Sequence, residues 1–539
     1  MKASMFQSIM LASALAVCCL AANVRAESPG KQPLKVYILA GQSNMTGMVG
    51  NHTLEHIQMF PDTAMEFAVL FDEEGNPVTI DEVIVSQWMD KDGGKLAPRY
   101  GGGSRGSMFG PEYPFGIYMH EARQEPFLMI KASQGGRSLN YHFRPPSAGE
   151  WVPPAGHPDS MEEEQKEPLP IPEKLDLPAD FMKSGEVVPE TASRRTGQYM
   201  GISGMRGVQL DEINGVNPIG VAFREGREER VPGRVLRGGD LIIGVAGAGL
   251  GENAIDQWRE AYWGARAIDG DWMLEMTLWR EGKIETINFD IAETLNGGRE
   301  ALPEHLEKMK QQEIAREEQR GGYYRMMIEH VKEVLGDIKN IHPAYDEEAG
   351  YEIAGFVWFQ GYNDLVSGGT YPNRDQPGGY DQYTWLLEHF IRDVRNDLDA
   401  PELPFVIGVL GVGGDQDPPT SHLGYFQQAQ AAVAENPEFK GTVANVRTGK
   451  YWDHDLANLI EGNGSSERLR NRDWAKVTGP DGKPVWNEKP SEEDYRTYVL
   501  KRAQSDQGYH YFGSGKIMSG IGKAFAEAML MLQDDTPTE

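Results

Sequence analysis

A serine follows directly on an apolar run in the segment Leu39-Ala-Gly-Gln-Ser-Asn-Met45. The hydroxyl of Ser43 is a weak nucleophile by itself, and it needs a base and oxyanion donors before it attacks a carbonyl. A serine that only caps a turn or a helix shows the same local pattern. Ser43 is therefore a candidate nucleophile, provided that suitable partners occur elsewhere in the chain.

Two segments offer donors for an oxyanion. The first, Ser133-Gln-Gly-Gly-Arg-Ser138, contains the pair Gly135 and Gly136, whose backbone N–H groups can approach a substrate closely. The second, Trp358-Phe-Gln-Gly-Tyr-Asn-Asp364, offers the side-chain amide of Asn363. The alternative for Asn363 and the aspartate after it is the capping of a turn.

A histidine near the carboxyl terminus is the candidate base. His510 ends the segment Asp506-Gln-Gly-Tyr-His510, and the alternative is a histidine packed between the tyrosines beside it. A second histidine, His454, lies between two carboxylates in the segment Asp453-His-Asp455. These are metal-ligand residue types, but no histidine at a ligand spacing accompanies them, so we expect a surface histidine and no metal site.

Apolar runs with strand character indicate where these segments lie relative to the predicted strands. They are Leu34–Ala40, Pro126–Ala132, Ile353–Phe359, Pro404–Leu410 and the weaker Thr442–Val446. Nearly continuous apolar runs indicate strands that are buried on both faces, and residues 380–398 and 515–532 show helical periodicity between or after them. The alternation predicts a parallel α/β sheet, with the site at the carboxyl ends of its strands.

Four segments carry these candidates, and they occur along the chain in the order that SGNH hydrolases show: they contain Ser43, the Gly135–Gly136 pair, Asn363 and His510. The chain resembles in particular the sialate O-acetylesterase and carbohydrate esterase family six branch, over about residues 34–144 and 323–532. The resemblance implies a three-layer, flavodoxin-like α/β fold and a serine esterase that removes O-acetyl groups from carbohydrates with no cofactor and no metal. A non-catalytic glycan-binding or scaffold protein, and a lipase or thioesterase of the same class, are the alternatives.

The resemblance also assigns roles. Ser43 attacks the acetyl carbonyl, and His510 takes its proton and returns it to the departing sugar hydroxyl. The oxyanion hole is formed by the N–H of Ser43, that of Gly135 or Gly136, and the side chain of Asn363. Further candidates for substrate contact are Gln42, Arg137 and Gln360, and a structural ion pair is an equal alternative for the arginine.

Two departures affect the assignment. Tyr362 stands where the branch commonly has a glutamate, so the broader Gly-x-Asn-Asp pattern is the better match. Gln507 stands three residues before the histidine, where the family has its acid. We therefore expect Asp506, one residue further back, to orient His510, with the two aspartates of the segment 453–455 as rivals.

The middle of the chain differs in composition. Residues 145–196 are rich in proline and acidic residues, which indicates an irregular linker. Residues 197–292, with the strand-turn-strand pattern Leu236-Arg-Gly-Gly-Asp-Leu-Ile-Ile-Gly-Val-Ala-Gly247, resemble a bacterial PDZ domain. There Tyr199-Met-Gly-Ile202 would line a groove for an extended peptide. A module that only buttresses the esterase is the alternative.

The remaining parts complete the organisation. Residues 293–322 are expected to form a charged helical connector, in which Gly321-Gly322 ends a helix over 304–320. The esterase core is then made in two parts, 27–144 and 323–539.

The first 26 residues have the pattern of a signal peptide. Lys2 precedes an apolar stretch from Ile9 to Ala22, and Val24-Arg25-Ala26 is a cleavage site. The stretch is too short to span a bilayer comfortably, so we expect export to the periplasm or beyond rather than a membrane anchor.

Cleavage removes Lys2, Arg25 and both cysteines, and it changes the net charge from −29 to −31. Disulfides and cysteine-bound zinc are thereby excluded, and such acidity makes nucleic acid and anionic membranes unsuitable partners.

Overall fold

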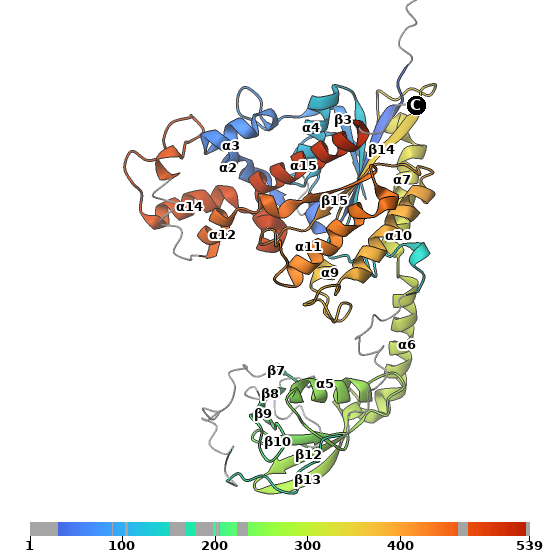
Figure 1. Ribbon diagram of the computed structural model, residues 1–539, viewed down its shortest axis with the longest axis vertical. Helices are drawn as coiled ribbons and strands as arrows, with labels where there is room; N and C mark the ends of the chain where they lie inside the picture. Colours follow the sequence, from blue (N-terminus) through green and yellow to red (C-terminus); the bar gives the residue numbers. More distant parts are fainter. Residues whose placement is uncertain are drawn as a thin grey trace, which may run out of the picture. The chain divides into compact units, whose positions relative to one another are not determined.

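The structure of the chain is a computed structural model that describes residues 31–88, 90–102, 106–150, 168–178, 181, 198–200, 202, 205–223, 235–461 and 473–534 (Figure 1). They belong to two compact units. The first unit is Met1–Arg137, Met326–Asn363 and Leu387–Glu539, and the second unit is Ser138–Arg325 and Asp364–Leu386. The expected signal peptide lies outside the described residues. No helix within the described ranges is long and apolar enough to cross a membrane.

A mainly parallel sheet of seven strands forms the centre of the first unit. Its spatial order is β16 (Val443–Arg447), β15 (Phe405–Val409), β14 (Tyr351–Phe359), β1 (Leu34–Gly41), β6 (Phe127–Ser133), β3 (Ile80–Gln87) and β4 (Asp90–Leu96). All neighbours pair in parallel except β3 and β4. The five strands predicted from apolar runs are confirmed.

The two strands at the β4 edge were not predicted. In β3 the apolar stretch is only Val83 to Val85, and it follows the exposed acidic residues Asp81 and Glu82. In β4 the sequence Asp-Lys-Asp-Gly-Gly-Lys-Leu is almost entirely polar. Such composition is common in an edge strand, and periodicity alone does not separate it from a loop.

Side chains of β14 alternate between the two faces of the sheet. Trp358 contacts Phe390, and their ring centroids lie 4.3 Å apart, whereas Phe359 contacts Phe525 at 5.4 Å. Phe390 belongs to α10 (Asp381–Asp397) and Phe525 to α15 (Gly515–Asp534). Helices therefore cover both faces, as Figure 1 shows, and α4 (Glu112–Arg123) packs beside α15.

The second unit contains an antiparallel sheet. Its order is β13 (Lys283–Asp290), β12 (Met273–Arg280), β10 (Leu241–Val245), β9 (Ile219–Phe223), β8 (Met205–Gln209) and β7 (Gln198–Tyr199), and β11 (Ala248–Gly249) pairs with β10. The helix α5 (Ala254–Ala265) contributes the buried Trp258 to its core. The Trp258 indole donates to the carbonyl of Met200 (2.9 Å), in the expected peptide-groove segment, of which Gly201 lies outside the described residues. The PDZ resemblance stays a prediction.

Two segments of this unit lie outside the expected PDZ-like region and pack on its cores. Residues 168–178, from the expected linker, form no helix or strand, but Gly249 N–H donates to Leu169 O (2.7 Å) and Leu175 packs beside Trp279. The charged helix α6 (Leu302–Glu318) buries Leu302, Leu306 and Met309 partly against the core around Trp258. The predicted break is confirmed, because α7 (Gly322–Gly336) begins at Gly322.

Candidate active site

Ser43 begins α1 (Ser43–Thr46), the four-residue helix that follows β1. Glycine at position 41 allows this turn to lie close to β14. The φ of Gly41 is +151°, and a Cβ there would lie 2.2 Å from Phe359 O of that neighbouring strand. No other residue fits so close to β14 without a shift of the backbone. The Ser43 side chain is half-buried at the carboxyl end of the central strand, as expected for a site on an α/β sheet.

The glycine pair lies beside this serine. Gln134 N–H donates to Gly41 O (3.0 Å), and a Cβ built on Gly135 would lie 3.6 Å from the Cβ of Ser43. A Cβ on Gly136 would meet no atom within 4 Å. Within the described part of the chain, the N–H groups of Ser43 and Gly135 have no acceptor. Gly135 is thus the member of the pair that lies against the serine.

One buried amide, that of Gln42, connects the segment Trp358–Asp364 to the turn that carries Ser43. Gln42 Oε1 accepts hydrogen bonds from Gln360 Nε2 (3.1 Å), Gly361 N (3.2 Å) and Asn363 N (3.3 Å). Gln360 Nε2 also donates to Arg137 O (3.0 Å). These bonds bring the half-buried Asn363 to the turn that carries Ser43.

The same bonds bear on the expected substrate contacts. The side chains of Gln42 and Gln360 are buried, 2% and 1% exposed, and they bond each other. This geometry suits groups that position the turn. Contact of Gln42, Gln360 or the half-buried Arg137 with substrate stays a prediction.

His510 faces the expected acid. Its Nδ1 lies 3.1 Å from Asp506 Oδ1, which also accepts from Gln507 N (2.6 Å). A carboxylate at Nδ1 leaves Nε2 as the nitrogen that can accept a proton. Asn44 Nδ2 donates to Tyr509 O (3.3 Å), so the residue after Ser43 is bonded to the residue before His510.

The backbone after His510 is held in a strained conformation. Tyr511 and Phe512 have φ values of +52° and +61°, each of which costs about 1–3 kcal/mol for such residues. The buried Tyr511 hydroxyl accepts from Gly411 N (2.7 Å) and lies 2.6 Å from Thr448 Oγ1. Burial raises the pKa of Tyr511, which keeps this hydroxyl protonated. Asp506 N donates to Phe512 O (3.0 Å), which closes the loop that carries the Asp–His pair.

The rival acids lie in other surroundings. Asp453 Oδ2 pairs with Lys516 Nζ (2.7 Å), and its Oδ1 accepts from Leu456 N (2.9 Å). Burial alone raises the pKa of Asp453, but the Lys516 ammonium and its hydrogen bond outweigh burial and hold that pKa below its usual range. Asp455 is exposed. Together with Asp453 it lines a cavity to which neither Asp506 nor His510 contributes.

A buried ion pair that contacts the end of α1 was not predicted. Lys131 Nζ donates to Glu112 Oε2 (2.7 Å), Thr46 O (2.9 Å) and Tyr100 O (2.7 Å), and both charged side chains are at most 2% exposed. Burial lowers the pKa of Lys131, and Glu112 opposes that shift. The bond to Thr46 O fixes the carboxyl end of α1. The signal in the sequence was a single lysine inside an apolar strand.

Ser43 lies at the carboxyl end of a parallel strand, the Gly135 N–H lies beside it, and Asp506 and His510 form a pair in a hydrogen-bonded loop. Residues 308–448 match the family described as carbohydrate esterase, sialic acid-specific acetylesterase. That stretch contains Gln360 and Asn363 but neither Ser43 nor His510.

Similarity to solved structures is remote. A protein of Arabidopsis thaliana is 10% identical, with 77% of this chain and 86% of that chain covered and a TM-score of 0.30. A carbohydrate acetylesterase from Xanthomonas citri is 9% identical, with 76% and 49% covered and a TM-score of 0.28. Neither likeness is close enough to support a conclusion about this chain. No curated protein matches it.

Proposed function

We propose that the protein is an exported serine esterase that removes O-acetyl groups from carbohydrates. The observation that carries the proposal is the Asn44–Tyr509 hydrogen bond, because it holds the Asp506–His510 loop at the turn that presents Ser43. The match of residues 308–448 to a carbohydrate esterase family supports acetylated sugars as the substrate class.

In the first half-reaction, His510 Nε2 accepts the Ser43 proton as Oγ attacks the acetyl carbonyl. The N–H groups of Ser43 and Gly135 and the amide of Asn363 donate to the oxyanion. The Asp506 carboxylate stabilises the imidazolium that forms. Collapse of the tetrahedral intermediate breaks the bond to the sugar oxygen, which takes the proton from His510 and leaves an acetyl-serine.

In the second half-reaction, His510 takes a proton from water, whose oxygen attacks the acetyl-serine. The same donors hold the oxyanion, and collapse releases acetate and returns the proton to Ser43. The reaction needs one base used twice, and the hydrogen bonds from Asp506 N to Phe512 O and between His510 Nδ1 and Asp506 Oδ1 support a fixed position for that base.

The test is hydrolysis of 4-nitrophenyl acetate, butyrate and octanoate, together with acetate release from O-acetylated sialic acid and acetylated xylan. We expect the acetyl ester to be the fastest of the three, and Ser43→Ala to be inactive on all substrates. Absence of hydrolysis by the wild type on every substrate would favour a non-catalytic glycan-binding protein, and equal measurable rates for the wild type and Ser43→Ala would contradict Ser43 as the nucleophile. Fastest cleavage of the octanoate would favour a lipase or thioesterase.

Two finer parts of the proposal have their own tests. Export predicts that the mature chain isolated from cells begins near Glu27, which amino-terminal sequencing checks. The PDZ resemblance predicts that the second unit adds a peptide to the edge of its antiparallel sheet. Screening of a library of free peptide carboxyl termini checks this, and absence of any binder would favour the buttress alternative.

A further inference from the structure

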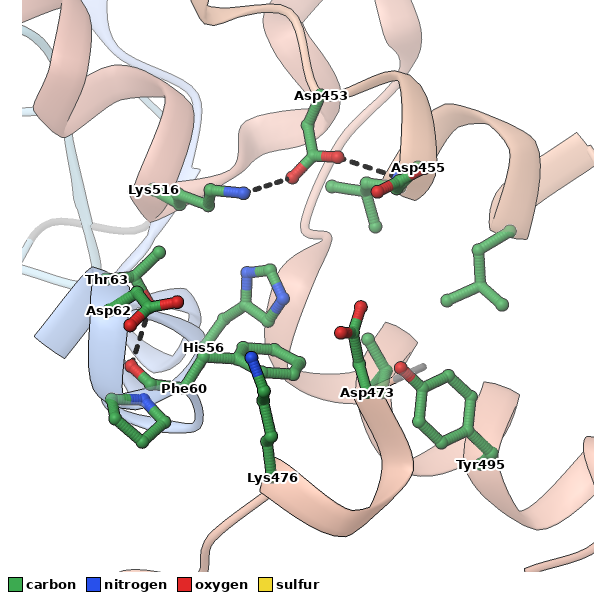
Figure 2. Close-up of a pocket in the computed structure, with 14 residues that line it drawn as sticks. His56, Phe60, Asp62, Thr63, Asp453, Asp455, Asp473, Lys476, Tyr495 and Lys516 are labelled. Carbon is green, nitrogen blue, oxygen red and sulfur yellow. Dashed lines mark hydrogen bonds and ion pairs between the residues drawn. The ribbon is translucent and has the colours of Figure 1, made fainter. Parts of the chain in front are cut away.

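A cavity in the first unit shares no lining residue with the candidate active site. It has a volume of about 170 Å³ and lies among α2 (Leu54–Gln58), α3 (Pro61–Glu66), α12 (His454–Glu461), α14 (Glu492–Ala503) and the start of α15. Figure 2 shows His56 and Phe60 on one side of it and Asp473 and Tyr495 on the other.

His56 is a buried polar side chain directed into this cavity. It is 5% exposed, and its ring projects between the Asp453–Lys516 pair and Asp473 (Figure 2). Nδ1 has no hydrogen-bond partner among the described residues. Burial and the Lys516 charge lower the pKa of His56 to about 4, so the ring is neutral at pH 7 and offers one donor and one acceptor. Buried polar groups are rarely left unpaired, which points to a ligand that supplies the partner.

The lining combines an apolar wall with convergent polar groups. Phe60 presents an aromatic ring, while the Asp473 carboxylate and the Lys476 and Lys516 ammonium groups offer acceptors and donors around it. A sugar ring matches this pattern, because its hydroxyls both donate and accept and its C–H groups pack on an aromatic ring. The volume lies below the roughly 300 Å³ of pockets for drug-sized ligands, which limits the ligand to one ring.

The charges select among ligands. Four aspartates and two lysines line the cavity, so an anionic sugar is disfavoured. Lys516 and Lys476 lie on opposite sides of the neutral His56 ring (Figure 2), so a cationic amino group placed against this ring meets a like charge on each side despite the four aspartates. Within the described residues, no group of His, Cys, Asp and Glu side chains is arranged to hold a metal ion.

We propose that this cavity binds one uncharged sugar residue. The binding follows from the lining alone. Its use, which is to hold an unesterified residue of the glycan while an ester of the same glycan lies at Ser43, rests on the proposed function. The candidate active site would then act on chains that carry acetyl groups next to free sugars.

Binding is tested on the full chain carrying Ser43→Ala, by ligand-observed NMR with methyl xyloside, methyl glucoside and methyl galactoside. These probes contain no ester, so the result does not depend on hydrolysis. We expect saturable binding of at least one probe. We also expect about tenfold weaker binding after Asp473→Asn or Lys476→Ala, the usual effect of losing one charge-assisted hydrogen bond.

The matched control is the exposed pair Asp481 and Lys483, whose charged atoms lie 3.4 Å apart outside the cavity. Asp481→Asn and Lys483→Ala should leave binding unchanged. In the active chain, Asp473→Asn should raise KM for acetylated xylan but leave hydrolysis of 4-nitrophenyl acetate unaltered. Three results would overturn the proposal: no saturable binding of any neutral probe, binding unaffected by the cavity variants, or tighter binding of glucuronate or glucosamine.

Discussion

We expect the Ser43 hydroxyl to contribute chemistry rather than packing, since its side chain is half-buried in a turn that backbone bonds already hold. Ser43→Ala should therefore leave the melting temperature unchanged and lower kcat for acetyl esters by about 10³ or more, as loss of a serine nucleophile does. Kinetics on 4-nitrophenyl acetate and a thermal melt check this. Activity within about threefold of wild type would remove Ser43 from the nucleophile role.

The acid that orients His510 can be identified by comparing aspartates. Asp506→Asn should lower kcat by roughly 10³ to 10⁴ with the fold retained, because the amide favours the wrong imidazole tautomer. Asp455→Asn should leave kcat unchanged. Asp453→Asn should weaken folding through Lys516 rather than affect the chemical step. If only Asp453→Asn or Asp455→Asn is crippled in kcat, Asp506 is an ordinary turn residue.

The buried His56 makes stability depend on pH. Its pKa is about 4 in the folded chain against 6.5 ordinarily, so the unfolded chain binds more protons between these values. The stability associated with a neutral His56 is fully present above pH 6.5 and is lost as the pH falls toward 4. The full loss is about 3 kcal/mol. Urea unfolding at pH 7 and pH 4.5 should show a smaller difference for His56→Gln than for wild type, and equal differences would contradict the assignment.

At the scale of elements, the short helix α1 depends on the strand beneath it. Lys131→Met leaves Glu112 buried without its partner and should lower the free energy of unfolding by about 3–5 kcal/mol. The double variant Lys131→Met, Glu112→Leu should regain most of that stability. Its kcat should remain below wild type, because Thr46 O has lost the donor that fixes α1.

The exposed pair Lys95 and Asp81, 2.8 Å apart, is the matched control for these unfolding measurements. Lys95→Met should change stability by less than about 1 kcal/mol. A double variant with wild-type kcat would show that the Lys131 bond to Thr46 does not position the nucleophile.

The sequence predicts elements well where one signal dominates. The five apolar strands and the glycine break before α7 were located because burial and chain breaking leave direct patterns. It does not predict β3 and β4, since their pairing is set by a neighbour rather than by composition.

In the candidate site, the sequence supplied the residue types but not their network. Segments far apart in the chain are joined by the three bonds to Gln42 Oε1, by the Lys131–Glu112 pair and by the contacts of the Tyr511 hydroxyl with Gly411 and Thr448. No local pattern encodes such contacts, and the inward direction of a polar side chain follows only from the fold.

At the scale of the whole molecule, the part of the second unit that contains its antiparallel sheet is expected to fold by itself. The fragment 168–318 includes Leu175, Leu302 and Leu306, which pack on its cores, whereas the fragment 197–292 lacks all three. Both should unfold cooperatively, and the longer one at a higher urea concentration. Circular dichroism during urea titration checks this. A disordered spectrum for both would contradict an independent unit and the PDZ resemblance.

The position of β1 between β6 and β14 determines how late in synthesis the parallel sheet can be completed. Leu34 pairs with Tyr351, so the central strand leaves the ribosome more than 300 residues before one of its two partners. Contacts this distant in sequence form slowly, and an unpaired strand edge is prone to aggregate meanwhile. The proposed export through a membrane would require an unfolded chain, and a central strand that cannot be paired on both sides early would help to keep the chain unfolded until then.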